Sequence, residues 1–145
     1  MIIARQMKRA PHLVVDDRQT IESIQNDFNR LYPFLKLGFF KTPGTKGKGN
    51  AKSNMYLSNE KLEFIQKVKK NGLYHLPVNT TVAEIERIFE SDFGLYVQVF
   101  RKSGNVWLET SATDDWTLEQ QNEEGKSLAQ HYQIERESAE DHDIY

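Results

Sequence analysis

No cysteine occurs among the 145 residues of the sequence. This absence excludes disulfide bonds, thiolate metal sites and a cysteine nucleophile, and it is typical of proteins from a reducing compartment. Long apolar runs are missing too, because no stretch approaches the roughly 20 apolar residues of a transmembrane helix. The residues up to Pro11 also lack the apolar core of a secretory signal. The sequence therefore predicts a cytoplasmic protein that does not bind membranes.

Patterns that carry catalytic chemistry are absent as well. The four histidines are scattered along the chain: His12, His75, His131 and His142. His12 and His75 fall on predicted neighbouring strands, but no third ligand accompanies them at the spacing of a zinc site. The pairs Asp16–Asp17 and Asp114–Asp115 each precede a predicted helix, where negative charge favours the helix N-terminus. We find no nucleophile with an adjacent base, so we predict a protein without catalytic activity, cofactor or metal.

Each part of the chain is poor in charge of one sign. Residues 1–108 carry 17 basic and 10 acidic residues, a net charge of +7. Residues 109–145 carry 2 basic and 11 acidic residues, a net charge of −9. A basic body with an acidic tail suggests three roles for the tail: folding back on the body, repelling polyanions, or keeping the protein in solution.

The clearest local structure is predicted for residues 81–110. Thr81 and Glu84 have the spacing of a capping box, which opens an amphipathic helix. Gly94 can adopt the left-handed conformation that ends a helix. Alternating apolar and polar residues then predict two strands, joined by a turn at Ser103–Asn105.

The same pattern occurs earlier in the chain. Residues 12–41 repeat the order strand, capped helix, strand that is seen in residues 75–101. The matched positions include Thr20 with Thr81, Ile24 with Ile85, and Phe28 with Phe89. Two related β-α-β units explain the match. The alternative is that two amphipathic helix–strand pairs look alike because they obey the same physics.

The predicted elements place the protein in the α+β class. Their order predicts a two-layer sandwich, ferredoxin-like or split βαβ, built from two β-α-β units and a C-terminal hairpin strand. A β-grasp-like sheet is the alternative. We expect one domain over residues 1–133, with a short helix over 60–70 and a strand over 73–78. We expect a last helix from Thr117 to Gly125 and an acidic, disordered tail over 134–145.

A loop rich in glycine and lysine spans residues 42–59 and is expected to be flexible. Its glycines and lysines suit phosphate oxygens, but their spacing is not that of a P-loop. Contact with a polyanion is the more plausible function, with these candidate residues: Lys46, Lys48, Lys52, Arg101 and Lys102. The alternative is a solvated basic loop without a partner.

Three aromatic residues fall on the same side of the predicted hairpin: Tyr96, Phe100 and Trp107. They predict an interaction face, either for a protein or for stacked bases, although no RNA-binding signature accompanies them. The alternative is a second apolar face that a helix, a terminal segment or another subunit covers.

One stretch resembles known sequences. TVAEIERIFESDFGLYVQVFRKSGNVWLET, followed by TDDWTLEQQNEEG, resembles a group of short uncharacterised proteins of anaerobic gut bacteria. The resemblance covers roughly residues 75–126 and excludes the N-terminal third and the lysine loop. It implies one compact structural unit over this stretch and no particular activity.

Two functions remain as hypotheses. The first is a non-enzymatic protein-interaction module that uses a sheet edge or the aromatic face, with self-association into a homodimer as a variant. The second is a nucleic-acid-binding protein that uses the lysine loop and the aromatic face, with the acidic tail competing for the same basic patch.

Overall fold

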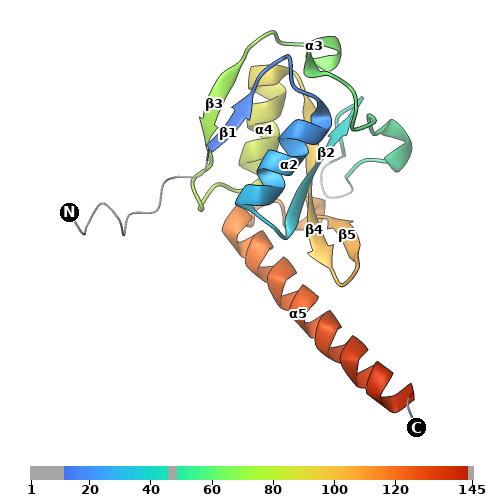
Figure 1. Cartoon of the computed structure of the whole chain (residues 1–145). Coiled ribbons are helices and arrows are strands. Elements are labelled where there is room, and N and C mark those ends of the chain that lie inside the picture. Colours follow the sequence, from blue (N-terminus) through green and yellow to red (C-terminus); the bar gives the residue numbers. More distant parts are fainter. Residues whose placement is uncertain (1–11, 46–48, 144–145) are drawn as a thin grey trace, which may run out of the picture.

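The computed structural model describes residues 12–45 and 49–143, and describes the backbone alone over 140–143. Its strands are β1 (His12–Val15), β2 (Leu35–Phe40), β3 (Gly72–His75), β4 (Tyr96–Ser103) and β5 (Val106–Glu109). Its α-helices are α2 (Ile21–Leu31), α3 (Leu62–Ile65), α4 (Val82–Phe93) and α5 (Leu118–Asp143). Two 3₁₀ turns complete the set, η1 (Lys52–Asn54) and η2 (Ser111–Thr113). Figure 1 shows their arrangement.

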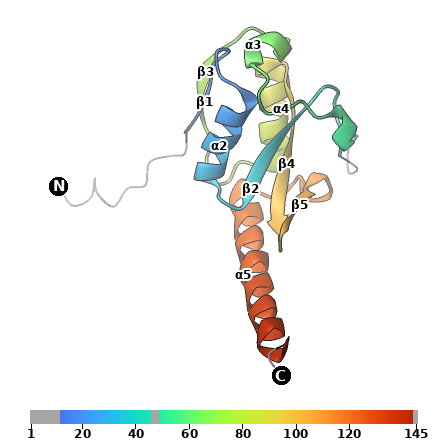
Figure 2. The same cartoon turned by 45° about the vertical axis from the view of Figure 1, so that its right-hand side comes forward.

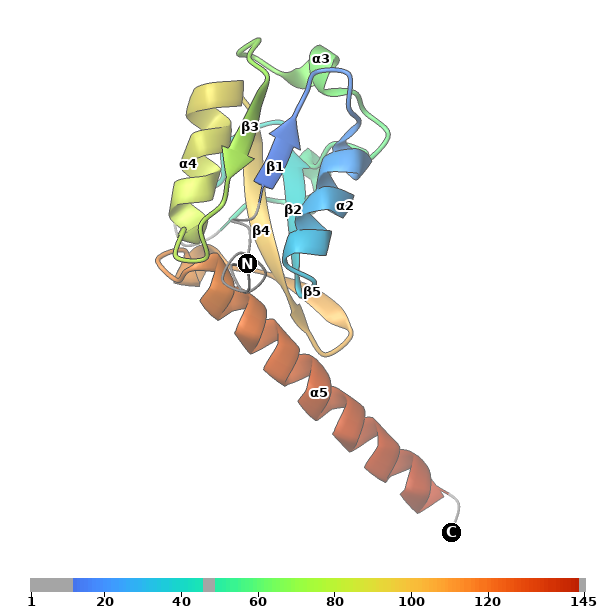
Figure 3. The ribbon, with the colours of Figure 1, turned by 60° about the vertical axis from the view of Figure 1, so that its left-hand side comes forward.

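The elements form two layers around one core. Strands β2, β4 and β5 make an antiparallel sheet in the order β2-β4-β5. The antiparallel pair β1–β3 faces that sheet, with α2 and α4 on either side of the pair (Figure 3). Apolar side chains from both layers meet between them, among them Leu13, Phe28, Leu37, Phe89 and Val99. The predicted α+β two-layer architecture is confirmed.

Helices α2 and α4 begin where the sequence predicts. The Thr20 hydroxyl accepts a hydrogen bond from the Ser23 amide at 3.2 Å. At α4 the capping box is complete, because Thr81 Oγ1 accepts from the Glu84 amide and Glu84 Oε2 accepts from the Thr81 amide. Gly94 ends α4 in the left-handed conformation at φ 60°, which a residue with a Cβ adopts only at a cost.

The strand pairing interleaves the two β-α-β units. In a ferredoxin-like or split βαβ arrangement the four strands share one sheet. Here β1 pairs with β3, and β2 pairs with β4 in a separate sheet that β5 extends. The physical reason is that β2 is buried at every residue but Lys36, and β4 is buried over residues 97–100, so the two strands are stable when paired with each other and covered on both faces.

The repeat seen in the sequence is also a repeat of local structure. Thr20, before α2, forms an isolated bridge with Lys61, and Thr81, before α4, forms one with Thr117. In each of the two strand pairings, one pair of matched positions lies opposite each other: His12 with His75 at the end of one, and Gly38 with Gln98 near the middle of the other. An approximate two-fold rotation between the two units would produce this pairing of matched positions.

Two elements are shorter than the sequence predicts. Strand β3 ends at His75 rather than at residue 78, because Pro77 has no amide hydrogen for the ladder. Helix α3 has four residues rather than the eleven of 60–70. Leu62 is buried and Ile65 packs against the core, whereas Phe64 and, beyond the helix, Val68 are exposed.

Helix α5 is longer than the sequence predicts. It begins at the predicted capping box of Thr117 and Gln120, but it passes through Gly125 and continues to Asp143. Gly125 lies against β2 and β4, where an added Cβ would come within 2.9 Å of Phe34 Cβ. The glycine therefore permits close packing instead of ending the helix, and the chain over 134–143 is helical where we predicted disorder. Figure 2 shows the distal half of α5 projecting from the body.

The described part of the loop 42–59 is attached to the sheet at several points. Met55 forms a bridge with Phe40, and the Lys41 amide donates to the Asn54 carbonyl at 2.8 Å. Thr45 and Gly49 exchange two backbone hydrogen bonds of 2.9 Å. The segment therefore lies over the sheet. None of the helices in the described residues combines the length and apolar character that crossing a membrane requires.

Candidate binding pocket on the outer sheet face

The sheet β2-β4-β5 has an inner face toward the core and an outer face. Residues paired across antiparallel strands point to the same face. The register therefore assigns these residues to the outer face: Lys36, Gly38, Phe40, Tyr96, Gln98, Phe100, Lys102, Trp107 and Glu109. The predicted common side of Tyr96, Phe100 and Trp107 is thus the outer face.

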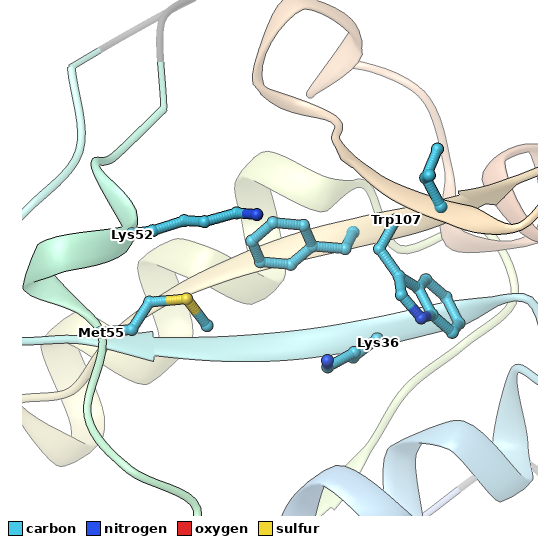
Figure 4. A pocket seen from close by; sticks show the side chains of 6 residues that line it. Lys36, Lys52, Met55 and Trp107 are labelled. Carbon is cyan, nitrogen blue, oxygen red and sulfur yellow. The ribbon is translucent and has the colours of Figure 1, made fainter.

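A cavity of about 300 Å³ lies on this face, and we call it the Trp107 pocket. Its lining residues are Lys36, Lys52, Met55, Phe100, Val106 and Trp107. Lys52 and Met55 enter from the loop at one end and Trp107 from β5 at the other, with Lys36 at the side (Figure 4). The pocket therefore forms only when β2, β4, β5 and the loop come together.

Phe100 is held in place by close packing at Gly38. The Phe100 ring stacks on Phe40, with centroids 6.4 Å apart and planes 20° apart. A Cβ added at Gly38 would lie 2.6 Å from the Phe100 ring. A glycine at this position of β2 therefore leaves room for the aromatic ring, which is only 9% exposed.

Two lysines lie over the Trp107 indole, and a third lines the opposite end of the pocket (Figure 4). The Nζ atoms of Lys36 and Lys102 lie 5.9 Å and 5.1 Å from the Trp107 ring centroid, within the range of a cation–π interaction. Lys52 lines the same pocket. Glu109 is the acidic residue of this face, and it accepts a hydrogen bond from the Asn50 amide at 3.4 Å. The pocket thus combines an aromatic wall with an excess of positive charge.

The structure separates the residues that we predicted for polyanion contact. Lys52 and Lys102 lie in or beside the Trp107 pocket. Arg101 points to the other face, where its Nη1 donates to Gln121 Oε1 at 2.9 Å and its guanidinium lies 5.6 Å from the Trp116 ring. The remaining two predicted residues, Lys46 and Lys48, lie outside the described residues.

The predicted aromatic face is divided as well. Phe100 and Trp107 line the pocket, but Tyr96 lines a second cavity further along β4. The Lys67 ammonium lies 4.3 Å from the Tyr96 ring centroid. The face is therefore not one continuous stacking surface. The sequence analysis did not identify Lys36 and Met55 as pocket residues. The only sequence signal for Lys36 was the alternation of β2, and the only one for Met55 was its place in the long loop that follows.

Neither the histidine pair nor a comparison with known proteins assigns a function to the chain. His12 and His75 do lie opposite each other, with ring centroids 4.5 Å apart, on the exposed side of β1–β3. Within the described ranges, no group of three His, Asp or Glu side chains could hold a metal ion. Comparisons with protein families, with curated proteins and with solved structures found no match to the chain.

Proposed function

We propose that the protein is a non-enzymatic interaction module that binds an acidic segment of a partner protein at the Trp107 pocket. The observation that carries this proposal is the placement of Lys36 and Lys102 over one half-buried indole, with Lys52 at the other end of the same pocket. Interfaces commonly use a tryptophan in a small pocket as an anchor. Three ammonium groups favour a carboxylate beside the apolar group that contacts the ring.

The size of the pocket supports a single anchoring side chain. Its volume of about 300 Å³ is at the lower end of ligand sites. Phe100 forms an apolar surface that is almost fully covered, and Met55 adds a flexible thioether that adapts to different shapes. An acidic residue next to a leucine or phenylalanine in the partner matches both the positive charge and the apolar surface of the pocket.

The test is a fluorescence titration with Trp107 as the reporter. The chain has two tryptophans, so Trp116→Phe leaves the emission of Trp107 alone. The probe is a blocked pentapeptide with two glutamates around a leucine, and its glutamine counterpart is the uncharged control. We expect the acidic peptide to change the emission and the glutamine peptide to bind at least about tenfold more weakly, since charged hydrogen bonds contribute about 1.5–3 kcal/mol.

Lysine variants make the test specific. The triple change Lys36→Gln, Lys52→Gln and Lys102→Gln should abolish binding of the acidic peptide. The matched control removes three exposed lysines that do not line the pocket: Lys61→Gln, Lys70→Gln and Lys126→Gln. This control has the same net charge and should bind as the parent does. Equal binding of both peptides, or equal loss in both triple variants, contradicts the proposal.

Nucleic acid is the second candidate, supported by the gathering of lysines on one face. A single strand would place one base against Trp107 and phosphates on Lys36, Lys52 and Lys102. With three phosphate contacts, the logarithm of the affinity should fall with the logarithm of the salt concentration at a slope of about −2. A short oligothymidylate in the same titration decides between the candidates. Binding of the oligonucleotide without binding of the acidic peptide supports the second one.

A further inference from the structure

A second cavity lies beside β4, between α4 and the start of the loop. Its volume is about 120 Å³. Its lining residues are Pro43, Gly44, Glu86, Glu90, Tyr96, Val97 and Gln98. We call it the Glu86 cavity. It shares no lining residue with the Trp107 pocket, so the two can be tested separately.

Two acceptor atoms at this cavity have no donor in the part of the chain that the structure describes. Glu86 Oε1 and Gln98 Oε1 are buried and have no hydrogen-bond partner among the described residues. Gln98 is only 8% exposed. A buried acceptor without a donor costs about 1–3 kcal/mol, and such atoms in folded proteins usually have a partner. The missing partner must supply N–H or O–H groups.

The surroundings of the Glu86 cavity are negatively charged. Glu90 lines it from α4, and Glu109 on β5 and Asp114 after η2 act on the Glu86 carboxyl through space. At the rim, the Lys67 ammonium already lies over the Tyr96 ring. An anion is therefore disfavoured, and a cation with several N–H donors matches both the charge and the free acceptors.

We propose that the Glu86 cavity binds the protonated amine or guanidinium group of a ligand, with Glu86 and Gln98 Oε1 as acceptors. The cavity has room for such a group, since one water needs roughly 10–15 Å³ of the same kind of volume. The amine belongs either to a lysine or arginine side chain of a protein or to a free organic cation.

Binding at this site is linked to the ionisation of Glu86. Burial, followed by the charges of Asp114 and Glu109, raises the pKa of Glu86 to about 8. The empty site therefore holds a largely protonated carboxyl at pH 7, and a bound cation favours the carboxylate. Binding should release a proton below pH 8. The affinity should rise by up to about tenfold per pH unit and level off above pH 8.

The experiment is an NMR titration of the full chain with methylammonium, followed at the amide signals of Gln98. We expect saturable shifts and the pH dependence given above. Tetramethylammonium has the same charge but no N–H donor, so it should bind at least about tenfold more weakly. A blocked peptide with a central lysine distinguishes the sources: tighter binding than methylammonium indicates a protein side chain, and equal binding indicates a free amine.

Variants complete the test. Glu86→Gln preserves the shape and should weaken methylammonium binding at least about tenfold, with no remaining pH dependence. Gln98→Met should weaken it without changing the pH dependence. Glu22→Gln, on an exposed turn of α2, is the matched control and should bind normally. The proposal is overturned if methylammonium causes no shift, if tetramethylammonium binds equally, or if Glu86→Gln binds normally.

Discussion

Gly125 is the residue whose role differs most from what its type indicates. A glycine near the end of an amphipathic stretch is usually a stop signal. Here it lies in the middle of α5, where the helix backbone comes close to Phe34 and Arg101. An added Cβ would lie 2.9 Å from Phe34 Cβ and 3.1 Å from the Phe34 carbonyl oxygen. The backbone of Phe34, directly before β2, cannot shift as easily as the end of a flexible side chain.

At the scale of one residue, we predict that Gly125→Ala destabilises the protein. Alanine has the better helix propensity by about 1 kcal/mol, but the clash with Phe34 should cost more. We expect the free energy of unfolding to fall by roughly 1–3 kcal/mol in urea titrations. Ser127→Ala, on an exposed position of the same helix, is the control and should be neutral or slightly stabilising. A more stable Gly125→Ala protein would contradict this account.

At the scale of the element, local signals predicted the starts of helices well. The hydroxyls of the capping residues Thr20, Thr81 and Thr117 each accept from the backbone amide three residues further on, so the sequence alone contains these caps. The length of α5 could not be predicted in this way, because the fit of Gly125 depends on β2. Beyond it, residues 126–143 contain neither glycine nor proline and many good helix formers.

The binding pocket shows the same division between local and distant information. The alternation in β4 and β5 predicted that Phe100 and Trp107 share a face. Lys36 and Met55 lie in the same pocket because β2 pairs with β4 and the loop pairs with β2. The pairing of β2 with β4 links residues about 60 positions apart, and no local sequence pattern specifies it. Arg101 differs, because it follows Phe100 in β4 and strand alternation alone places it on the opposite face; only its contact with Gln121 of α5 is non-local.

For the element α5, we predict that its distal end contributes little to the stability of the domain. Side chains over 134–139 are exposed. A chain that ends at Gln133 should lose helical signal in far-UV circular dichroism, while its free energy of unfolding changes by less than about 0.5 kcal/mol.

The effect of this truncation should be compared with that of Gln121→Ala, a substitution in the first turn of the same helix. Gln121 is fully buried and binds Thr113 and Arg101. Its loss should cost roughly 2–3 kcal/mol, because several buried groups lose their partners. If the truncated chain were destabilised as much as Gln121→Ala, the distal helix would have a structural role that its exposure does not indicate.

At the scale of the whole molecule, neither β-α-β unit has a sheet of its own. Strand β1 finds its partner in β3, and β2 finds its partner in β4. Each half of the chain therefore holds the strands that complete the other half. The two helices α2 and α4 cover a core to which both halves contribute, including Phe28 from one and Phe89 from the other.

We predict that the two halves fold only together. Fragments 1–70 and 71–145 should each lack cooperative unfolding, because the first would leave β1 and β2 unpaired and the second would leave β3 unpaired and one edge of β4 open. When the fragments are mixed, the far-UV and near-UV circular dichroism of the intact protein should return. As a control, Gly38→Val in the first fragment should prevent reassembly, since a side chain there meets the Phe100 ring. A fragment that unfolds cooperatively on its own would refute the prediction.

The interleaved pairing also has a consequence for synthesis on the ribosome. The chain emerges from its N-terminus, and translation adds about 5–20 residues per second. Strand β2 ends at Phe40 and β4 begins at Tyr96, so the apolar strand β2 waits roughly 3–11 s for its partner. During that interval Leu35, Leu37 and Phe39 have no sheet to join, and they are exposed to chaperones and to neighbouring nascent chains. Helix α5 emerges last and then packs against the sheet that β2, β4 and β5 have formed.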